Sequence, residues 1–560
     1  MARPDNIIVD EGTAMKKRVA FLLIVSFLFF ATEAFAKKVI GVTAFKNLTK
    51  DNNITWLEIG IADSVSYKLR NVEDYIVVDR TNVDKLMEEV ALGQTGVIDE
   101  DSAKQAGKAL GADLIVVGNF QKFGNQVRIS ARIVEVESHK VLKQVQATGI
   151  LDQIFDLQDQ IALKIIDETN ISITSAVKER IKNNATRNIS AYEYFVKGQK
   201  YLLFQLDYIK AIEMYNKAVE IDDRYSLAYA GLGKAYSLRS WELRNYHNRT
   251  DPSLVEKSYK YSTKALEIDP YLDEAHVSLA RYYQEVDQNK VPNKWKLCEK
   301  EARKAIEINP NNSEAYFLLS KVFAYDDKKE EHYLLETIER NKFFTDAHNN
   351  LGVIYLNRGD YDQALKYFKN AVDIDPGYKV GYMNQGVVYE RKGQYHDAVE
   401  MYKAVLEKYP KYSLGLRNLG IGYRQLKEYD KALDAFEKAI KVDKKDFKAW
   451  SEKAYIYLLK GEYNTAIKYY KDSLKLNNTY RYTLANLGYC YSQLGKYKQA
   501  IPYLENAHKY NNDYAWAAGY LGWIYRYKLN DMQNAKYWYG EALKRDPNNN
   551  DYRTNYNQLQ

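Results

Sequence analysis

The sequence has 560 residues, enough for about three or four domains of ordinary size. Its net charge of +7 is small for this length and gives no support for nucleic-acid binding. The two cysteines, Cys298 and Cys490, are too few for a disulfide framework or a cysteine-only metal site and are interpreted as buried thiols.

The chain opens with the pattern of a secretory signal peptide over residues 15–36. The pattern has a basic start, an apolar run and a cleavage motif: Lys16-Lys17-Arg18, residues 19–31 and Ala34-Phe35-Ala36. We therefore expect Met15 to be the initiator, residues 1–14 to be an upstream mis-start, and the mature chain to begin at Lys37. An uncleaved anchor is the alternative. The pattern predicts an exported protein in the periplasm, either free or associated with the outer membrane.

Residues 37–178 alternate between strand and helix patterns, which predicts an α+β domain with a mixed sheet and packed helices. Short β-branched runs predict strands, and apolar residues at helical spacing predict helices. The predicted strands are 37–47, 75–80, 112–123, 126–138 and 140–150, and the predicted helices are 54–70, 81–92, 101–111 and 152–178. Residues 179–189 are polar and unpatterned. They are interpreted as a linker, so the domain is expected to fold without the rest of the chain.

Several short stretches of this domain, taken in their order along the chain, indicate a family resemblance. They are AFKN, Trp56 followed by Gly60, YIVVDR, ALGADLIVVGNF and ARIVEVESHKVL. In this order they resemble the domain of the curli-secretion (CsgG-type) family and its FlgO-type and TolB amino-terminal-like relatives. The resemblance implies a periplasmic α/β domain that docks to an envelope or outer-membrane component. The sequence lacks the acylated cysteine and the long extra hairpins of the pore-forming members, so a secretion pore is not expected.

From residue 190 onward the pattern is helical and repeats every 34 residues. The repeated alanines are Ala364, Ala398, Ala432, Ala466 and Ala500, and a matching series of small residues includes Gly352, Gly386 and Gly420. This resembles the tetratricopeptide repeat. The resemblance implies an all-α superhelical solenoid of about ten repeats over 190–548, followed by a polar tail over 549–560. The fourth repeat departs from the pattern, with Thr337 and Lys342 where Ala and Pro are usual.

In tetratricopeptide proteins the first helix of each repeat lines a concave groove that grips a peptide or partner helix. The sixth position of that helix is expected to face the groove, and it holds Asn350, Asn384, Asn418, Glu452 and Asn486. Asn offers a donor and an acceptor, so such a row can pair with a peptide backbone without reading its sequence. Nearby Arg391, Arg417 and Arg424 would favour an acidic partner. The alternative is that Asn is simply common at this position and that the Arg side chains are solvated.

The sequence contains no recognisable catalytic, metal-binding or cofactor-binding motif. The seven histidines do not stand at metal-ligand spacing, and no phosphate-binding loop, nucleophile elbow or dinucleotide fingerprint occurs. We therefore expect no catalytic residues, no metal and no cofactor.

These observations predict a non-enzymatic exported scaffold that binds a protein or peptide partner in its groove. Residues 37–178 would dock to an envelope component or to copies of the chain. One alternative is an accessory component of an outer-membrane secretion or assembly apparatus of the CsgG type. A second alternative is an enzyme with an unrecognised site.

Overall fold

The computed structural model describes residues 37–559, apart from 50, 79–81, 85–99, 139–140, 248–249 and 511–514. The expected signal peptide and most of the expected helix 81–92 lie outside the described residues. The chain divides between Ala347 and His348 into two compact units, and each is described by itself.

The first unit begins with a five-stranded mixed sheet in the order β2-β1-β3-β4-β5. Strand β1 (Lys38–Asn47) pairs in parallel with β2 (Tyr75–Val77) and with β3 (Leu114–Phe123). Strands β4 (Gln126–Glu135) and β5 (Val141–Ile150) extend the sheet as an antiparallel meander. Parallel pairs need a crossover, and α2 (Leu57–Arg70) supplies the one between β1 and β2.

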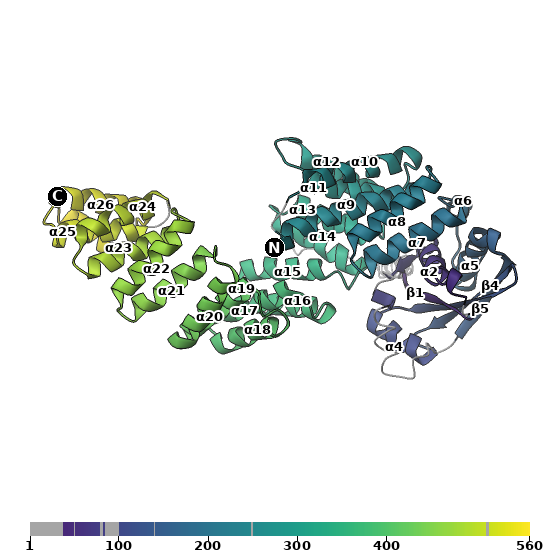
Figure 1. Cartoon of the computed structure of the whole chain (residues 1–560), viewed down its shortest axis with the longest axis horizontal. Coiled ribbons are helices and arrows are strands. Elements are labelled where there is room, and N and C mark those ends of the chain that lie inside the picture. The colour runs from purple at the N-terminus through teal and green to yellow at the C-terminus, as the bar shows by residue number, and fades with distance from the viewer. Residues whose placement is uncertain are drawn as a thin grey trace, which may run out of the picture. The chain divides into compact units, whose positions relative to one another are not determined.

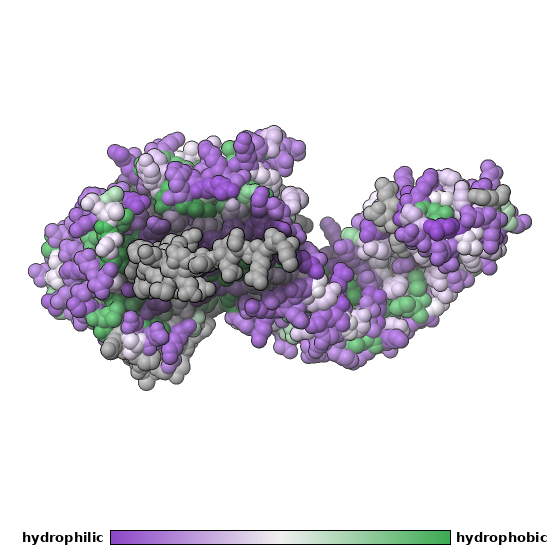
Figure 2. All heavy atoms as spheres, turned by 180° about the vertical axis from the view of Figure 1, so that it is seen from behind, coloured by the Kyte–Doolittle hydropathy of each residue, from purple (hydrophilic) through white to green (hydrophobic). Residues whose placement is uncertain are grey.

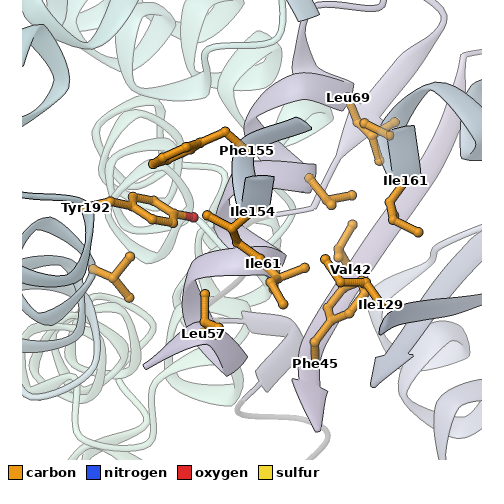
Figure 3. Packing of buried hydrophobic residues seen from close by; sticks show 14 of the residues in the cluster. Val42, Phe45, Leu57, Ile61, Leu69, Ile129, Ile154, Phe155, Ile161 and Tyr192 are labelled. Atoms are coloured by element: carbon orange, nitrogen blue, oxygen red, sulfur yellow. The ribbon is translucent and has the colours of Figure 1, made fainter. Parts of the chain in front are cut away.

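Helices cover both faces of this sheet. On one face, α2 and α5 (Ile154–Glu168) pack on strand residues such as Val42 and Ile129, as Figure 3 shows. On the other face, α4 (Glu100–Leu110) packs in a smaller cluster with Ile115 and Val117. Neighbouring strand residues point to opposite faces, which explains why β3 contributes to both clusters.

The helix expected over 152–178 is interrupted, so that expectation is wrong. Helix α5 ends at Glu168, and Asn170 adopts a positive φ of 58°, which a continuous helix does not allow. A second helix, α6 (Ser175–Lys182), then begins with the Thr174 side chain accepting a hydrogen bond from the Val177 N–H. Helix α6 runs into the segment expected as a linker, where Ile181 is fully buried.

The rest of the chain consists of antiparallel helix pairs. In each repeat we call the first helix the A helix and the second the B helix. The first unit contains α7 (Ile189–Leu203), α8 (Tyr208–Ile221), α9 (Ser226–His247), α10 (Pro252–Ile268), α11 (Asp273–Glu285), α12 (Lys294–Ile308), α13 (Ser313–Val322) and α14 (Asp327–Arg340). Helix α15 (Thr345–Arg358) begins at the boundary between the units. Figure 1 shows these helices following the sheet domain.

The second unit continues the same pattern. Its further helices are α16 (Tyr361–Ile374), α17 (Lys379–Arg391), α18 (Tyr395–Lys408), α19 (Ser413–Gln425), α20 (Tyr429–Val442), α21 (Phe447–Leu459), α22 (Tyr463–Leu476), α23 (Arg481–Gln493), α24 (Tyr497–Lys509), α25 (Ala515–Tyr527) and α26 (Met532–Arg545). The expected polar tail forms a short helix, α27 (Asn550–Asn557). The two helices of a pair pack closely where one of them carries a small residue. At Gly420, for example, a Cβ would lie 2.5 Å from the Phe436 ring.

Candidate partner-binding groove

The A helices of the first unit are partly covered by the sheet domain itself. The Tyr192 hydroxyl on α7 donates a 2.5 Å hydrogen bond to the Gly60 carbonyl on α2. Tyr67 on α2 packs on the cluster that contains Ala230 of α9 and Ala275 of α11. Helix α2 therefore lies on the A-helix face of the first three repeats, packed against the sheet on one side and against these helices on the other.

Loops that join successive repeats also contact the sheet domain. The Asn311 amide, in the loop between α12 and α13, donates to the Tyr75 carbonyl at the start of β2. Phe343, between α14 and α15, packs on the cluster around α4, and the neighbouring Lys342 lies against Gly111. The departure of the fourth repeat at Lys342 thus coincides with a contact to the sheet domain, which a proline ring could not make.

A buried ion pair joins α2 to α5, and hydrogen bonds from the same lysine reach the end of α6 and the segment that follows it. Lys68 is 3% exposed, and its Nζ contacts Asp159 at 2.6 Å. The same Nζ donates to the Ile181 carbonyl at 2.7 Å and to Asn184 Oδ1 at 2.9 Å. Burial lowers the pKa of Lys68, and the Asp159 carboxylate opposes that shift. Residues 181–184 are therefore fixed to the sheet domain.

A second charged cluster links the A helices of repeats two to four. Glu314 on α13 contacts Lys234 Nζ on α9 at 3.1 Å and also contacts Arg281 on α11. Burial alone would raise the pKa of Glu314, but Arg281 and Lys234 outweigh it and lower that pKa to about 2.

In the second unit the asparagine row is half-buried, and its amides have different surroundings. Asn384 donates to Asn349 Oδ1 at 2.8 Å. Asn418 lies beside the Tyr402 hydroxyl, and Asn486 lies beside the Tyr470 hydroxyl. Asn350 Nδ2 is buried without a hydrogen-bond partner among the described residues.

The three predicted arginines do not form one cluster. Arg417 contacts Asp446 at 2.5 Å, and both side chains are largely buried. Arg424 Nε lies 3.3 Å from Glu452 Oε2, and burial raises the pKa of that carboxyl while Arg424 opposes the shift. Arg391 is exposed. Two of the three positive charges therefore already face a carboxylate of the same unit.

An aromatic stripe on the last A helix was not predicted. Trp516, Tyr520 and Trp523 on α25 stack ring on ring, with centroids 4.9 Å and 5.4 Å apart. Tyr489 of the preceding A helix packs beside Tyr520 at 5.6 Å. The signal was present in the sequence, because Tyr520 stands 34 residues after Asn486 and so occupies the position of the asparagine row. We call Trp516, Tyr520, Trp523 and Tyr489 the aromatic stripe.

Among the described residues, no three His, Cys, Asp or Glu side chains are grouped so that they could hold a metal ion. None of the described helices is both long enough and apolar enough to span a bilayer. The face shown in Figure 2 is mostly hydrophilic, with smaller hydrophobic areas between the polar residues.

Family models match both parts of the chain. The model of the curli production assembly/transport component CsgG matches residues 30–165. Tetratricopeptide repeat models match 345–378, 380–445 and 486–550. The model of subunit 3 of the anaphase-promoting complex, or cyclosome, matches 425–507.

Individual relatives are distant and much longer than their matching parts. Putative adenylate cyclase 3 of Rhizobium meliloti is 22% identical over 247 residues, which is 44% of this chain and 40% of that protein. Superkiller protein 3 of Schizosaccharomyces pombe is 29% identical over 138 residues, or 23% of this chain and 10% of that protein. The chain thus spans less than half the length of either relative.

One solved structure aligns with most of the chain. In the complex of Cut9 with Hcn1, the matching chain is 18% identical with a TM-score of 0.37, and the match covers 73% of this chain and 84% of that one. The chain combines a CsgG domain with tetratricopeptide repeats, and such repeats indicate a protein-interaction scaffold.

Proposed function

We propose that this protein is an exported, non-enzymatic scaffold whose second unit binds an extended segment of a protein partner on its A-helix face. The observation that carries the proposal is a difference between the two units. In the first unit, α2 lies on the A helices. In its described part, the second unit consists only of repeat helices and α27.

The side chains on the A-helix face of the second unit suit an extended peptide. The half-buried Asn amides can donate to and accept from a peptide backbone. The aromatic stripe adds rigid rings with polar tips, which lose little side-chain entropy on binding. Exposed Arg391 is the predicted arginine most available to an acidic residue of the partner.

Site-specific photocrosslinking in cells tests this proposal. A photoreactive residue is placed at Arg391 on the A-helix face, or at Lys438, an exposed side chain on B helix α20. We expect a discrete protein adduct from position 391 and none from position 438. An adduct from 438 alone would move the partner to the opposite face and contradict the proposal.

Export is supported by the pattern over residues 15–36. We expect the mature chain to begin at Lys37 in the periplasm, and N-terminal sequencing of the exported protein checks this. A mature product that retains Met15 would favour an uncleaved anchor.

A second candidate function is an accessory role in an outer-membrane secretion or assembly apparatus, and the match to the CsgG model favours it. Cell fractionation separates the two candidates. A secretion component sediments with outer membranes, whereas a free scaffold washes into the periplasmic fraction.

A further inference from the structure

A cavity lies where α2 meets the A helices of the first three repeats. Its volume is about 200 Å³, and residues of α2, α5, α7, α9 and α11 line it. Five aromatic rings contribute to the wall: Tyr67, Phe155, Tyr192, Phe195 and Tyr225. Two carboxylates, Asp63 and Glu274, also line it.

The unsatisfied polar groups of the cavity are mainly acceptors. Gln158 is 0% exposed, and its Nε2 donates to the Tyr192 hydroxyl at 3.2 Å. Its Oε1 has no hydrogen-bond partner among the described residues, and neither does Glu274 Oε2. A buried acceptor without a donor is costly, so this wall favours a molecule that brings donors.

The cations around the cavity are largely engaged. The three Nζ donors of Lys68 are matched by Asp159, the Ile181 carbonyl and Asn184. Lys234 is paired with Glu314 at 3.1 Å. Arg70 remains near Glu274, but the closest approach is 3.9 Å, which is too long for a good hydrogen bond.

Acceptors together with aromatic rings match one ligand chemistry. An ammonium group donates to carboxylate and amide oxygens, and its charge is attracted to the faces of aromatic rings. We propose that this cavity binds a small organic amine in its protonated form, with Gln158 Oε1 and the Glu274 carboxylate as its acceptors. The size agrees, because drug-sized ligands fill pockets of roughly 300–1,000 Å³ and this cavity is smaller.

The raised pKa of Glu274 is consistent with a carboxyl group that lacks a close counter-charge. Burial raises the pKa of Glu274, the neighbouring Asp273 raises it further, and Arg70 opposes the shift. A bound ammonium would supply the counter-charge that the carboxylate lacks. Binding is therefore best measured at mildly alkaline pH, which favours the ionised carboxylate while a primary amine remains protonated.

Calorimetric titration of the full chain with three matched probes tests the ligand class. The probes are 2-phenylethylamine, the neutral 2-phenylethanol and the anionic phenylacetate. We expect saturable binding of the amine and at least tenfold weaker binding of the other two. Equal binding of all three would reduce the site to a nonspecific apolar cavity, and binding of none would overturn the proposal.

Two substitutions with opposite expected effects locate the site. Glu274→Gln removes the negative charge and should weaken amine binding about tenfold or more. Arg70→Gln removes the competing cation and should tighten amine binding. Because Arg70 is partly exposed, this variant is expected to fold, and it still tests the proposal if Glu274→Gln does not fold. Glu256→Gln, at an exposed glutamate of α10, is the control and should change nothing. An Arg70→Gln variant that binds the amine no more tightly than the native chain would contradict the assignment.

Discussion

The asparagines spaced at 34 residues share one position on the A helices but have different partners. Where the preceding B helix carries Tyr402 or Tyr470, a hydroxyl lies beside the amide. Where it carries Phe368, no hydroxyl is available, and Asn384 instead pairs with Asn349. The row could be located from the repeat period, but its partners could not, because they depend on which aromatic residue stands one helix away.

The first prediction concerns partner binding by this row. Replacing Asn384 and Asn418 together by Ala removes two amides, each worth about 0.5–1.5 kcal/mol in a hydrogen bond to a partner. We expect about tenfold weaker binding of the crosslinked partner, measured by calorimetry, because about 1.4 kcal/mol is one decade. Asn464→Ala, at an exposed position of B helix α22, is the control. Unchanged affinity of the double variant would remove the asparagines from the binding face.

The second prediction concerns the small residues between paired helices. At Gly420 a Cβ would lie 2.5 Å from the Phe436 ring, so Gly420→Leu forces the helices apart. Overpacking of this kind costs about 1–3 kcal/mol, and occasionally more. Thermal unfolding should therefore shift to lower temperature. Gly393→Asn is the matched control, because no neighbouring atom lies within 4 Å of a Cβ there and Asn tolerates its positive φ of 73°. Equal melting of both variants would contradict the close approach.

The third prediction follows from the lowered pKa of Glu314. A carboxyl with a pKa of about 2 in the folded state and 4.5 as its ordinary value stabilises the fold above pH 4.5. That stabilisation is lost as the pH falls from 4.5 towards 2, by up to about 3 kcal/mol, since one pKa unit is about 1.4 kcal/mol. We expect Glu314→Gln to flatten the acid limb of the unfolding free energy measured by urea denaturation. An acid limb as steep as that of the native chain would show that other carboxylates dominate it.

At the scale of elements, the strands and most helices follow from local patterns, whereas the position of α2 does not. The apolar residues Leu57, Ile61, Val65 and Leu69 predict an amphipathic helix with one buried face. In the structure the opposite face is also covered, through Gly60 and Tyr67. That contact joins residues more than 130 positions apart, and helical periodicity carries no information about such pairs. The unusual Lys342 was a sequence signal only for the separate contact with Gly111, and it could not be interpreted without the position of the sheet domain.

The fourth prediction tests the contact between the fourth repeat and the sheet domain. Phe343 is partly buried against the cluster around α4, so Phe343→Ala should cost less than the 3–5 kcal/mol of a fully buried Phe, about 1–2 kcal/mol. Amide hydrogen exchange should rise in α4, far away in sequence. Tyr325→Ala is the control, because that ring is fully exposed. Unchanged exchange in α4 would show that Phe343 does not hold the domain.

At the scale of the whole molecule, the two fold classes were predictable because each has its own period, about two or 3.6 residues within elements and 34 between repeats. The packing of the sheet domain on the first repeats was not predictable. The polar segment 179–189 indicates a boundary by composition, yet the hydrophobic cluster of the sheet domain continues through Ile181 and Tyr192 into the first repeats. Figure 3 shows the Tyr192 ring reaching towards Ile154 and Phe155. The polar composition of a segment indicates that most of its side chains are exposed to solvent. A few buried apolar side chains in that segment are nevertheless enough to pack two domains together.

The fifth prediction tests this continuity with fragments. Fragment 37–178 lacks Ile181 and Tyr192, and burying one large apolar side chain contributes roughly 1.5–3 kcal/mol. Small domains are stable by only about 5–15 kcal/mol, so the loss is a sizeable fraction. We expect 37–178 to melt at a lower temperature than 37–347, measured by circular dichroism. Fragment 37–182 restores Ile181 but not Tyr192 and should fall between them. If 37–178 melts like 37–347, with equal hydrogen-exchange protection of α2, the packing on the repeats adds no stability and residues 179–189 act as a linker.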